Sequence, residues 1–182
     1  MAYVGIDNQA AGQTAAYLVG SSLPKKSATV FVTVLSIGFS CEEERQLAFS
    51  PALHQYSPHL SSVIVSEGFG RNIETQSLVQ AAIKRHPNMS GVYSIGGGNQ
   101  AVLDPFQNVD RHCHVFIAHD LDTDIRTLLH QGKINAVFHH DLCAPMRRCF
   151  LHVMQANGAL AHSIASENSV IQVITPINIP NI

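Results

Sequence analysis

Short apolar runs alternate with amphipathic, helix-like stretches along the whole chain. Runs at residues 3–6, 28–35, 61–66, 92–95, 115–118 and 134–138 have the length and composition of buried strands, and a last run covers residues 170–177. Between them the spacing of apolar residues predicts helices of about 10–15 residues. This alternation predicts an α/β fold in which a parallel sheet carries helices on both faces.

Several helix boundaries carry their own signals. Asp7 follows the first strand and is expected to cap the next helix, because its side chain accepts a hydrogen bond from a free N–H. Asp122 or Thr123 is expected to cap a helix that Gly132 ends. Pro105 should kink or end the helix in which it falls, since proline lacks the N–H.

Composition narrows the class of protein. The 182 residues, 46% of them apolar, suffice for one large domain or two small lobes. A net charge of −2 with 13% charged residues gives no electrostatic footprint for nucleic acid. The four cysteines form no CxxC pair, and neither a leader sequence nor a membrane-spanning apolar stretch is evident. We therefore expect a cytoplasmic protein without a membrane partner.

Polar side chains follow the predicted strands where those strands end. Because parallel strands end at one edge of a sheet, five residues are expected to converge there: Asp7, Arg45, Asn99, Asp120 and His140. Carboxylate, amide, guanidinium and imidazole groups together suit a polyhydroxylated ligand, whose hydroxyls both donate and accept hydrogen bonds. Taken singly, Asp7 has the alternative role of a helix cap, and Arg45 that of a solvated helix residue.

The glycine turn allows more than one interpretation. Gly96-x-Gly98-x-x-Ala101 fits a dinucleotide fingerprint, with Asp120 about 20 residues further on. That fingerprint normally begins a fold, whereas this one lies in the second half of the chain. A tight turn with no ligand, or another ligand at the same point of the sheet, are the alternatives.

Catalytic and metal sites are not indicated. The pairs His112/His114 and His139/His140 lack a carboxylate or cysteine at a familiar spacing, so we expect no metal. No G-x-S-x-G elbow or evidently activated cysteine is present. The sequence therefore favours binding over turnover, with no catalytic residue and no cofactor.

Five segments, in order, resemble the lac repressor family of bacterial transcriptional regulators. Val4-Gly-Ile-Asp-Asn-Gln-Ala-Ala-Gly resembles its Asp-Asn-x-x-x-Gly stretch, and Arg45-Gln-Leu-Ala-Phe its Arg-x-x-Gly-Phe helix with the glycine replaced or shifted. Val92-Tyr-Ser-Ile-Gly-Gly-Gly-Asn resembles the family branch with Gly-x-Gly-Asn. Phe116-Ile-Ala-His-Asp and Ala136-Val-Phe-His-His-Asp resemble its Gly-Tyr-Asp and Thr-Thr-Ile-x-Gln-Asp segments.

The resemblance implies a type I periplasmic-binding-protein-like fold of which residues 1–182 are the C-terminal portion, a fragment of a sugar-binding effector domain. Residues 1–140 would form mostly the C-terminal lobe, 141–169 the return helix to the N-terminal lobe, and 170–182 the final strand. The five strand-end residues would bind a small carbohydrate effector, with Phe39 or Phe69 as stacking faces. His140 replaces a more common glutamine-type donor.

The resemblance further implies a homodimer that represses transcription and contacts DNA only through an N-terminal domain that does not precede Met1. The first alternative is a periplasmic-type sugar-binding protein for transport. The second, less favoured, is an NAD-dependent enzyme that uses the turn at residues 96–101.

Overall fold

The core of the protein is one six-stranded sheet with strand order β2-β1-β3-β4-β5-β6. The computed structural model describes residues 3–35, 38–65, 71–160, 164–165 and 168–180. The strands are β1 (Ala28–Thr33), β2 (Leu60–Val65), β3 (Met89–Ser94), β4 (Val115–His119), β5 (Ala136–His139) and β6 (Gln172–Ile174). The first five are mutually parallel, whereas β6 runs antiparallel to β5.

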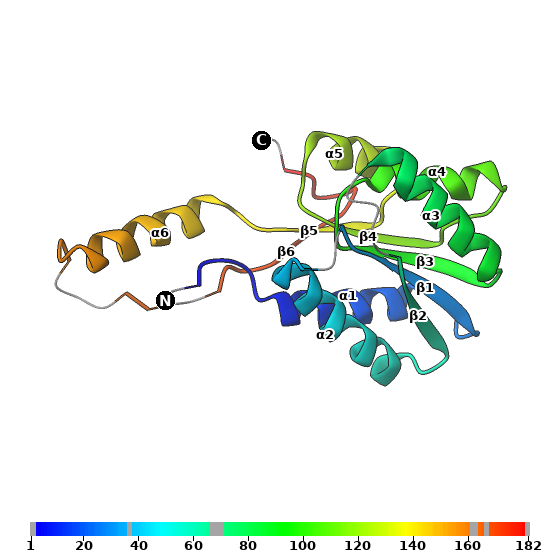
Figure 1. Ribbon diagram of the computed structural model, residues 1–182, viewed down its shortest axis with the longest axis horizontal. Helices are drawn as coiled ribbons and strands as arrows, with labels where there is room; N and C mark the ends of the chain where they lie inside the picture. The colour runs from blue at the N-terminus through cyan, green and yellow to red at the C-terminus, as the bar shows by residue number, and fades with distance from the viewer. Residues whose placement is uncertain (1–2, 36–37, 66–70, 161–163, 166–167, 181–182) are drawn as a thin grey trace.

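Helices cover both faces of this sheet, as the sequence predicts (Figure 1). They are α1 (Asn8–Ser22), α2 (Ser40–Tyr56), α3 (Asn72–Arg85), α4 (Asn99–Asn108), α5 (Thr123–His130) and α6 (Cys143–Ala156). One apolar cluster joins α1 and α2 to one face of the sheet, and a second joins α3, α4 and α5 to the other. None of the helices in the described ranges is long and apolar enough to cross a membrane.

The N-termini of α1 and α5 are capped as predicted. The Asp7 carboxylate accepts a hydrogen bond from the Ala10 N–H at 2.9 Å, and Asp122 accepts one from Ile125 at 2.7 Å. Gly132 follows α5 with a φ of +65°. Since β1 is buried at all six positions, its β-branched run has the double-sided burial that its sequence indicates.

Four expectations about elements need correction. Residues 3–6 form no strand, and Ile6 makes only a single bridge to Ser169. The final strand is limited to β6, and its antiparallel direction makes the sheet mixed rather than wholly parallel. The helix with Pro105 does not end there: α4 continues to Asn108, because buried Val102 and Phe106 hold it against the sheet. β5 begins at Ala136, since Ile134 lies in the turn before it.

Helix α6 lies apart from the other elements, at the end of an extended connection from β5 (Figure 1). Only Pro145 of its fourteen residues is buried. One stripe of the helix is apolar and exposed, namely Leu142 at its N-cap followed by Met146, Phe150 and Val153. The chain then returns past Ile6 to β6.

Candidate functional site

The carboxyl edge of the sheet brings the predicted polar residues to neighbouring strand ends. Asp120 directly follows β4, and His140 directly follows β5. Asn99 begins α4, just beyond β3, and Phe39 precedes α2, just beyond β1. The strand order reverses between β1 and β3, which is where ligands bind in open parallel sheets.

Arg45 is buried rather than solvated, and its position is fixed by contacts between α1 and α2. Its Nε donates a hydrogen bond to Asn8 Oδ1 at 2.9 Å, and Asn8 Nδ2 donates to Glu44 Oε2 at 2.8 Å. A Cβ on Gly12 would overlap the carbonyl oxygen of Arg45, so the close approach of α2 requires glycine there. Arg45 therefore reaches the corner of the edge where α1 begins.

Asp7 lies at that same corner, next to Asn8 in the chain. Its carboxylate already caps α1 through the Ala10 N–H. The cap interpretation of Asp7 is therefore confirmed, and its role toward a ligand stays a prediction.

Two of the predicted residues carry buried polar atoms without a partner. Asn99 Oδ1 and His140 Nδ1 are shielded from solvent and form no hydrogen bond in the described part of the chain. Asn99 itself is 8% exposed, and α4 has no side-chain cap at its N-terminus. A buried acceptor or donor that lacks a partner costs about 1–3 kcal/mol, and a bound ligand is one way to recover it.

Asp120 has a backbone conformation that few side chains adopt. Its φ is +62°, in the left-handed region that is unfavourable for L-residues and that asparagine and aspartate adopt more often than the others. Its N–H donates to the Phe138 carbonyl at 2.9 Å, and its own carbonyl accepts from Asp122. The carboxylate is exposed at the edge. Such strain collects at binding sites, because the surroundings must hold the residue in place.

Beneath this edge lies a buried pair that sequence reasoning missed. Tyr93 Oη lies 2.7 Å from His119 Nε2. Burial, then the Arg45 guanidinium and the His140 ring, hold the pKa of His119 well below 6.5. Burial also raises the pKa of the Tyr93 phenol. The pair is therefore neutral, and Arg45 and His140 are the charged or titratable groups that act on His119. Tyr93 and His119 lie within segments that the sequence does single out, but their contact joins positions 26 residues apart.

The two predicted stacking residues have different outcomes. Phe39 is 50% exposed, and its backbone carbonyl accepts from the N–H groups of Glu42 and Glu43 at the start of α2. Its ring is therefore available at the edge. Phe69 lies outside the described residues.

The glycine turn is shaped by packing. A Cβ on Gly96 would lie 2.6 Å from the Leu35 backbone nitrogen, so this glycine lets the turn contact the end of β1. Gly98 precedes α4 with a φ of +78°. Gly97 faces open space. Backbone geometry therefore accounts for Gly96 and Gly98 without a bound phosphate.

The histidines at the end of β5 do not form a metal site. Burial, followed by the neighbouring His140, lowers the pKa of His139 from 6.5. In the described ranges no group of three or more histidine, cysteine, aspartate or glutamate residues is placed to hold a metal ion.

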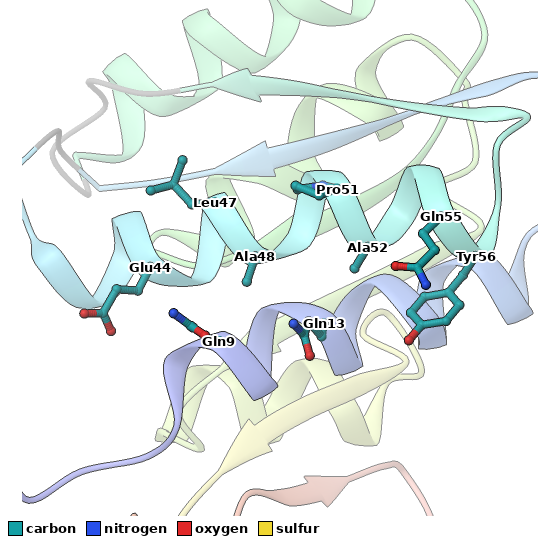
Figure 2. Close-up of a pocket in the computed structure, with 9 residues that line it drawn as sticks. All are labelled: Gln9, Gln13, Glu44, Leu47, Ala48, Pro51, Ala52, Gln55 and Tyr56. Carbon is teal, nitrogen blue, oxygen red and sulfur yellow. The ribbon is translucent and has the colours of Figure 1, made fainter.

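Two hollows lie near the edge. A crevice of about 20 Å³ between β1, β2, α3 and Gly97 is too small for a sugar. An open groove of about 410 Å³ runs between α1 and α2 on the outer face (Figure 2). Glu44 and Gln9 lie at one end of that groove, and Gln55 and Tyr56 at the other. Glu44 links this groove to the Asn8–Arg45 contact. Neither of these two hollows is lined by Asn99, Asp120 or His140.

Comparison with known proteins identifies the type of domain. The sequence matches the family described as "Periplasmic binding protein domain" over residues 1–141. No curated protein matches the chain. Several solved structures have the same fold, at identities too low to indicate more than that.

Three of these structures illustrate the similarity. A sugar-binding protein of a sugar ABC transporter from Bacillus halodurans aligns with a TM-score of 0.81 and 20% identity, over 97% of this chain and 65% of that one. A glucose-galactose binding protein from Geobacillus stearothermophilus gives 0.82 and 21%, over 99% and 64%. An ABC transporter periplasmic solute binding protein from Actinobacillus succinogenes, with bound D-allose, gives 0.78 and 17%, over 97% and 62%. The chain thus spans less than two thirds of the length of these proteins.

These comparisons correct one expectation and leave another without support. The expected cytoplasmic location is wrong, because the matching family is described as a periplasmic binding protein domain and the similar Actinobacillus succinogenes structure is named as a periplasmic solute binding protein. The predicted membership of the lac repressor family, with its DNA and homodimer partners, is supported by neither comparison. The α/β fold of periplasmic-binding-protein type is confirmed.

Proposed function

Since the chain belongs to the periplasmic binding protein domain family, we propose that it binds a small carbohydrate at the carboxyl edge of its sheet. The observation that carries this proposal is the pair of buried polar atoms without partners, Asn99 Oδ1 and His140 Nδ1. They lie at the ends of strands β3 and β5, on either side of Asp120. The three residues thus follow three adjacent strands of the sheet, β3, β4 and β5.

The donor set matches the chemistry of a sugar. Each hydroxyl of a sugar donates one hydrogen bond and accepts others. Asn99 and Asp120 supply acceptors, the Arg45 guanidinium supplies donors, and the His140 ring supplies either. The exposed Phe39 ring offers an apolar surface for the C–H face of a pyranose. Asp7, already committed to its helix cap, contributes its second carboxylate oxygen.

A solute-binding protein of the transport type is the better-supported parent for this domain. The similar structures are named as sugar-binding proteins: one of a sugar ABC transporter, one for arabinose and one for glucose and galactose. The glycine turn is the basis of the nicotinamide-enzyme hypothesis, but backbone geometry alone accounts for Gly96 and Gly98. We therefore place transport-type sugar binding ahead of both the repressor and the dehydrogenase hypotheses, and the domain acts outside the cytoplasm in this proposal.

The shape of the chain is explained if the chain forms one lobe of a two-lobed protein. In this proposal residues 1–140 form mostly one lobe, and 141–169 lead to the second lobe through α6. Residues 170–182 return to the sheet of the first lobe, where β6 pairs with β5. Two features support this division: the apolar stripe on α6 is exposed, and the hollow at the switch point is only about 20 Å³. A second lobe that packs on the α6 stripe would supply the opposite wall of a closed cleft.

Calorimetric titration and thermal shift against a panel of aldoses, ketoses and sugar phosphates test the proposal. We expect at least one neutral monosaccharide to bind and to raise Tm, and NAD to do neither. The variants Asn99→Ala and His140→Ala should weaken that binding, whereas Gln55→Ala, in the groove between α1 and α2, should not. If the carbohydrates leave Tm unchanged while NAD raises it, the dehydrogenase hypothesis replaces this one. A panel without any binder contradicts both.

A further inference from the structure

His119 is the last residue of β4, and its ring contacts side chains from the two neighbouring strands, β3 and β5. Its ring contacts the Tyr93 hydroxyl of β3 at 2.7 Å and meets the Phe138 ring of β5 edge-on, with centroids 5.4 Å apart. Tyr93 in turn stacks on Phe49 of α2, with a centroid distance of 4.7 Å. His119 is only 4% exposed. It therefore has no direct access to a ligand in the solvent.

Each element that contacts His119 or its partner carries a residue of the proposed sugar site. Phe49 lies one helical turn after Arg45 on α2. Phe138 lies two residues before His140, and Asp120 directly follows His119 itself. The His119–Tyr93 pair thus sits at the point where the supports of Arg45, Asp120 and His140 meet.

We propose that His119 is a positioning residue: through its hydrogen bond to Tyr93, it holds Asp120 in the orientation that accepts the sugar. This inference rests on the proposed sugar site. Asp120 has a φ of +62°, a conformation that costs about 1–2 kcal/mol for an L-residue and relaxes unless its neighbours hold it. Its own N–H is held by the Phe138 carbonyl. The preceding residue is held by the Tyr93 hydroxyl and the surrounding rings. With both sides fixed, Asp120 is oriented before the ligand arrives, which reduces the ordering cost of binding.

The neutral state of the ring is part of this role. The charged or titratable groups that act on His119 are Arg45 on α2 and His140 after β5, and the rings that contact it are those of Tyr93 and Phe138. A protonated His119 would place a second buried positive charge beside the Arg45 guanidinium. It would also lose the ability of Nε2 to accept from the Tyr93 hydroxyl.

The test compares His119→Gln with His119→Leu, each alone and together with Asp120→Asn, by calorimetric titration with the sugar that binds the wild type. Glutamine places its amide group near the position of Nε2, where the amide oxygen can accept from the Tyr93 hydroxyl, whereas leucine retains only volume. We expect His119→Leu to weaken binding about tenfold, corresponding to about 1.4 kcal/mol, and His119→Gln to restore most of that loss. In the Asp120→Asn background the His119→Leu change should have a much smaller effect, since a residue that acts through Asp120 loses its route.

The outcomes separate this inference from the proposed function. A wild type that binds no sugar contradicts the proposed function. A wild type that binds, with His119→Leu equally tight, contradicts the positioning role. An equal loss with and without Asp120→Asn also contradicts it, because a general structural effect would not depend on Asp120. If His119→Leu fails to fold, Tyr93→Phe removes the same hydrogen bond with less change in volume and is subject to the same comparison.

Discussion

Arg45 Nε lies 2.9 Å from Asn8 Oδ1, and this contact joins the first turn of α1 to the first turns of α2. It holds a buried guanidinium, 9% exposed as a residue, at the corner where Asp7 caps α1. Hydrogen bonds to charged groups contribute about 1.5–3 kcal/mol, because the charged partner is costly to leave without one in a buried place. The orientation of Arg45 toward a ligand therefore depends on Asn8.

Asn8→Ala should lower both stability and sugar affinity. The variant removes the acceptor of Arg45 Nε and the donor to Glu44, so we expect the free energy of unfolding to fall by about 1.5–3 kcal/mol. Urea denaturation measures this loss, and calorimetry the affinity. Gln9→Ala is the matched control, since Gln9 is exposed on the same turn. Equal effects of the two variants would contradict the importance of the Arg45–Asn8 contact.

Asp120→Gly should make the protein more stable and less able to bind. Glycine removes the cost of the left-handed backbone at φ +62°, while its greater freedom in the unfolded chain offsets part of the gain. We expect a net gain of up to about 1 kcal/mol, or about 2–4 °C in Tm, together with loss of sugar binding. Asp120→Asn, which also tolerates this φ, separates the charge from the backbone. A drop in Tm for Asp120→Gly would show that the carboxylate stabilises the fold instead.

Asn99→Ala should weaken sugar binding without a loss of stability. Because Asn99 Oδ1 is buried without a partner, its removal relieves a desolvation cost in the ligand-free protein. We expect Tm to stay the same or rise, and sugar affinity to fall about tenfold or more. Gln100→Ala, an exposed neighbour on α4, provides the comparison. Should Tm fall sharply with Asn99→Ala, the amide serves the fold and not a ligand.

The sequence predicts the layers of this fold because their signals are local. The continuous β-branched run of β1, the Asp7 and Asp122 caps and Gly132 each act within a few residues, and all are confirmed. The edge at which Asn99, Asp120 and His140 lie follows from the parallel order of β1 to β5 alone.

What the sequence does not predict depends on contacts between distant segments. The direction of β6 is decided by where the chain returns after α6, and no short pattern encodes that path. The sequence predicts that Arg45 lies on a solvated helix surface unless it binds a ligand. In the structure, the packing of α1 on α2 buries it. The His119–Tyr93 contact likewise arises only when β3 and β4 pair.

Acid should destabilise the protein, in part through His119. In the folded state the pKa of His119 is held well below 6.5, its value in the unfolded chain. Between the folded and the unfolded pKa, the unfolded chain therefore binds a proton that the folded protein does not. The contribution is fully present above about pH 6.5 and is lost as pH falls below it, with a slope of at most about 1.4 kcal/mol per pH unit. Urea denaturation at several pH values should show a shallower decline for His119→Gln than for the wild type. Parallel curves would contradict a neutral buried His119. His139, whose pKa is also lowered, contributes equally to both proteins.

Sugar binding at the carboxyl edge is best tested by a titration followed by ¹H–¹⁵N NMR, because this measurement detects weak binding and reports where the ligand lies. With a monosaccharide at millimolar concentrations, we expect saturable changes in the chemical shifts of the amides along the carboxyl edge, at residues 97–101, 120–122 and 139–142. Shifts confined to the groove between α1 and α2, around Gln13 and Gln55, or no shifts with any sugar of the panel, would contradict it.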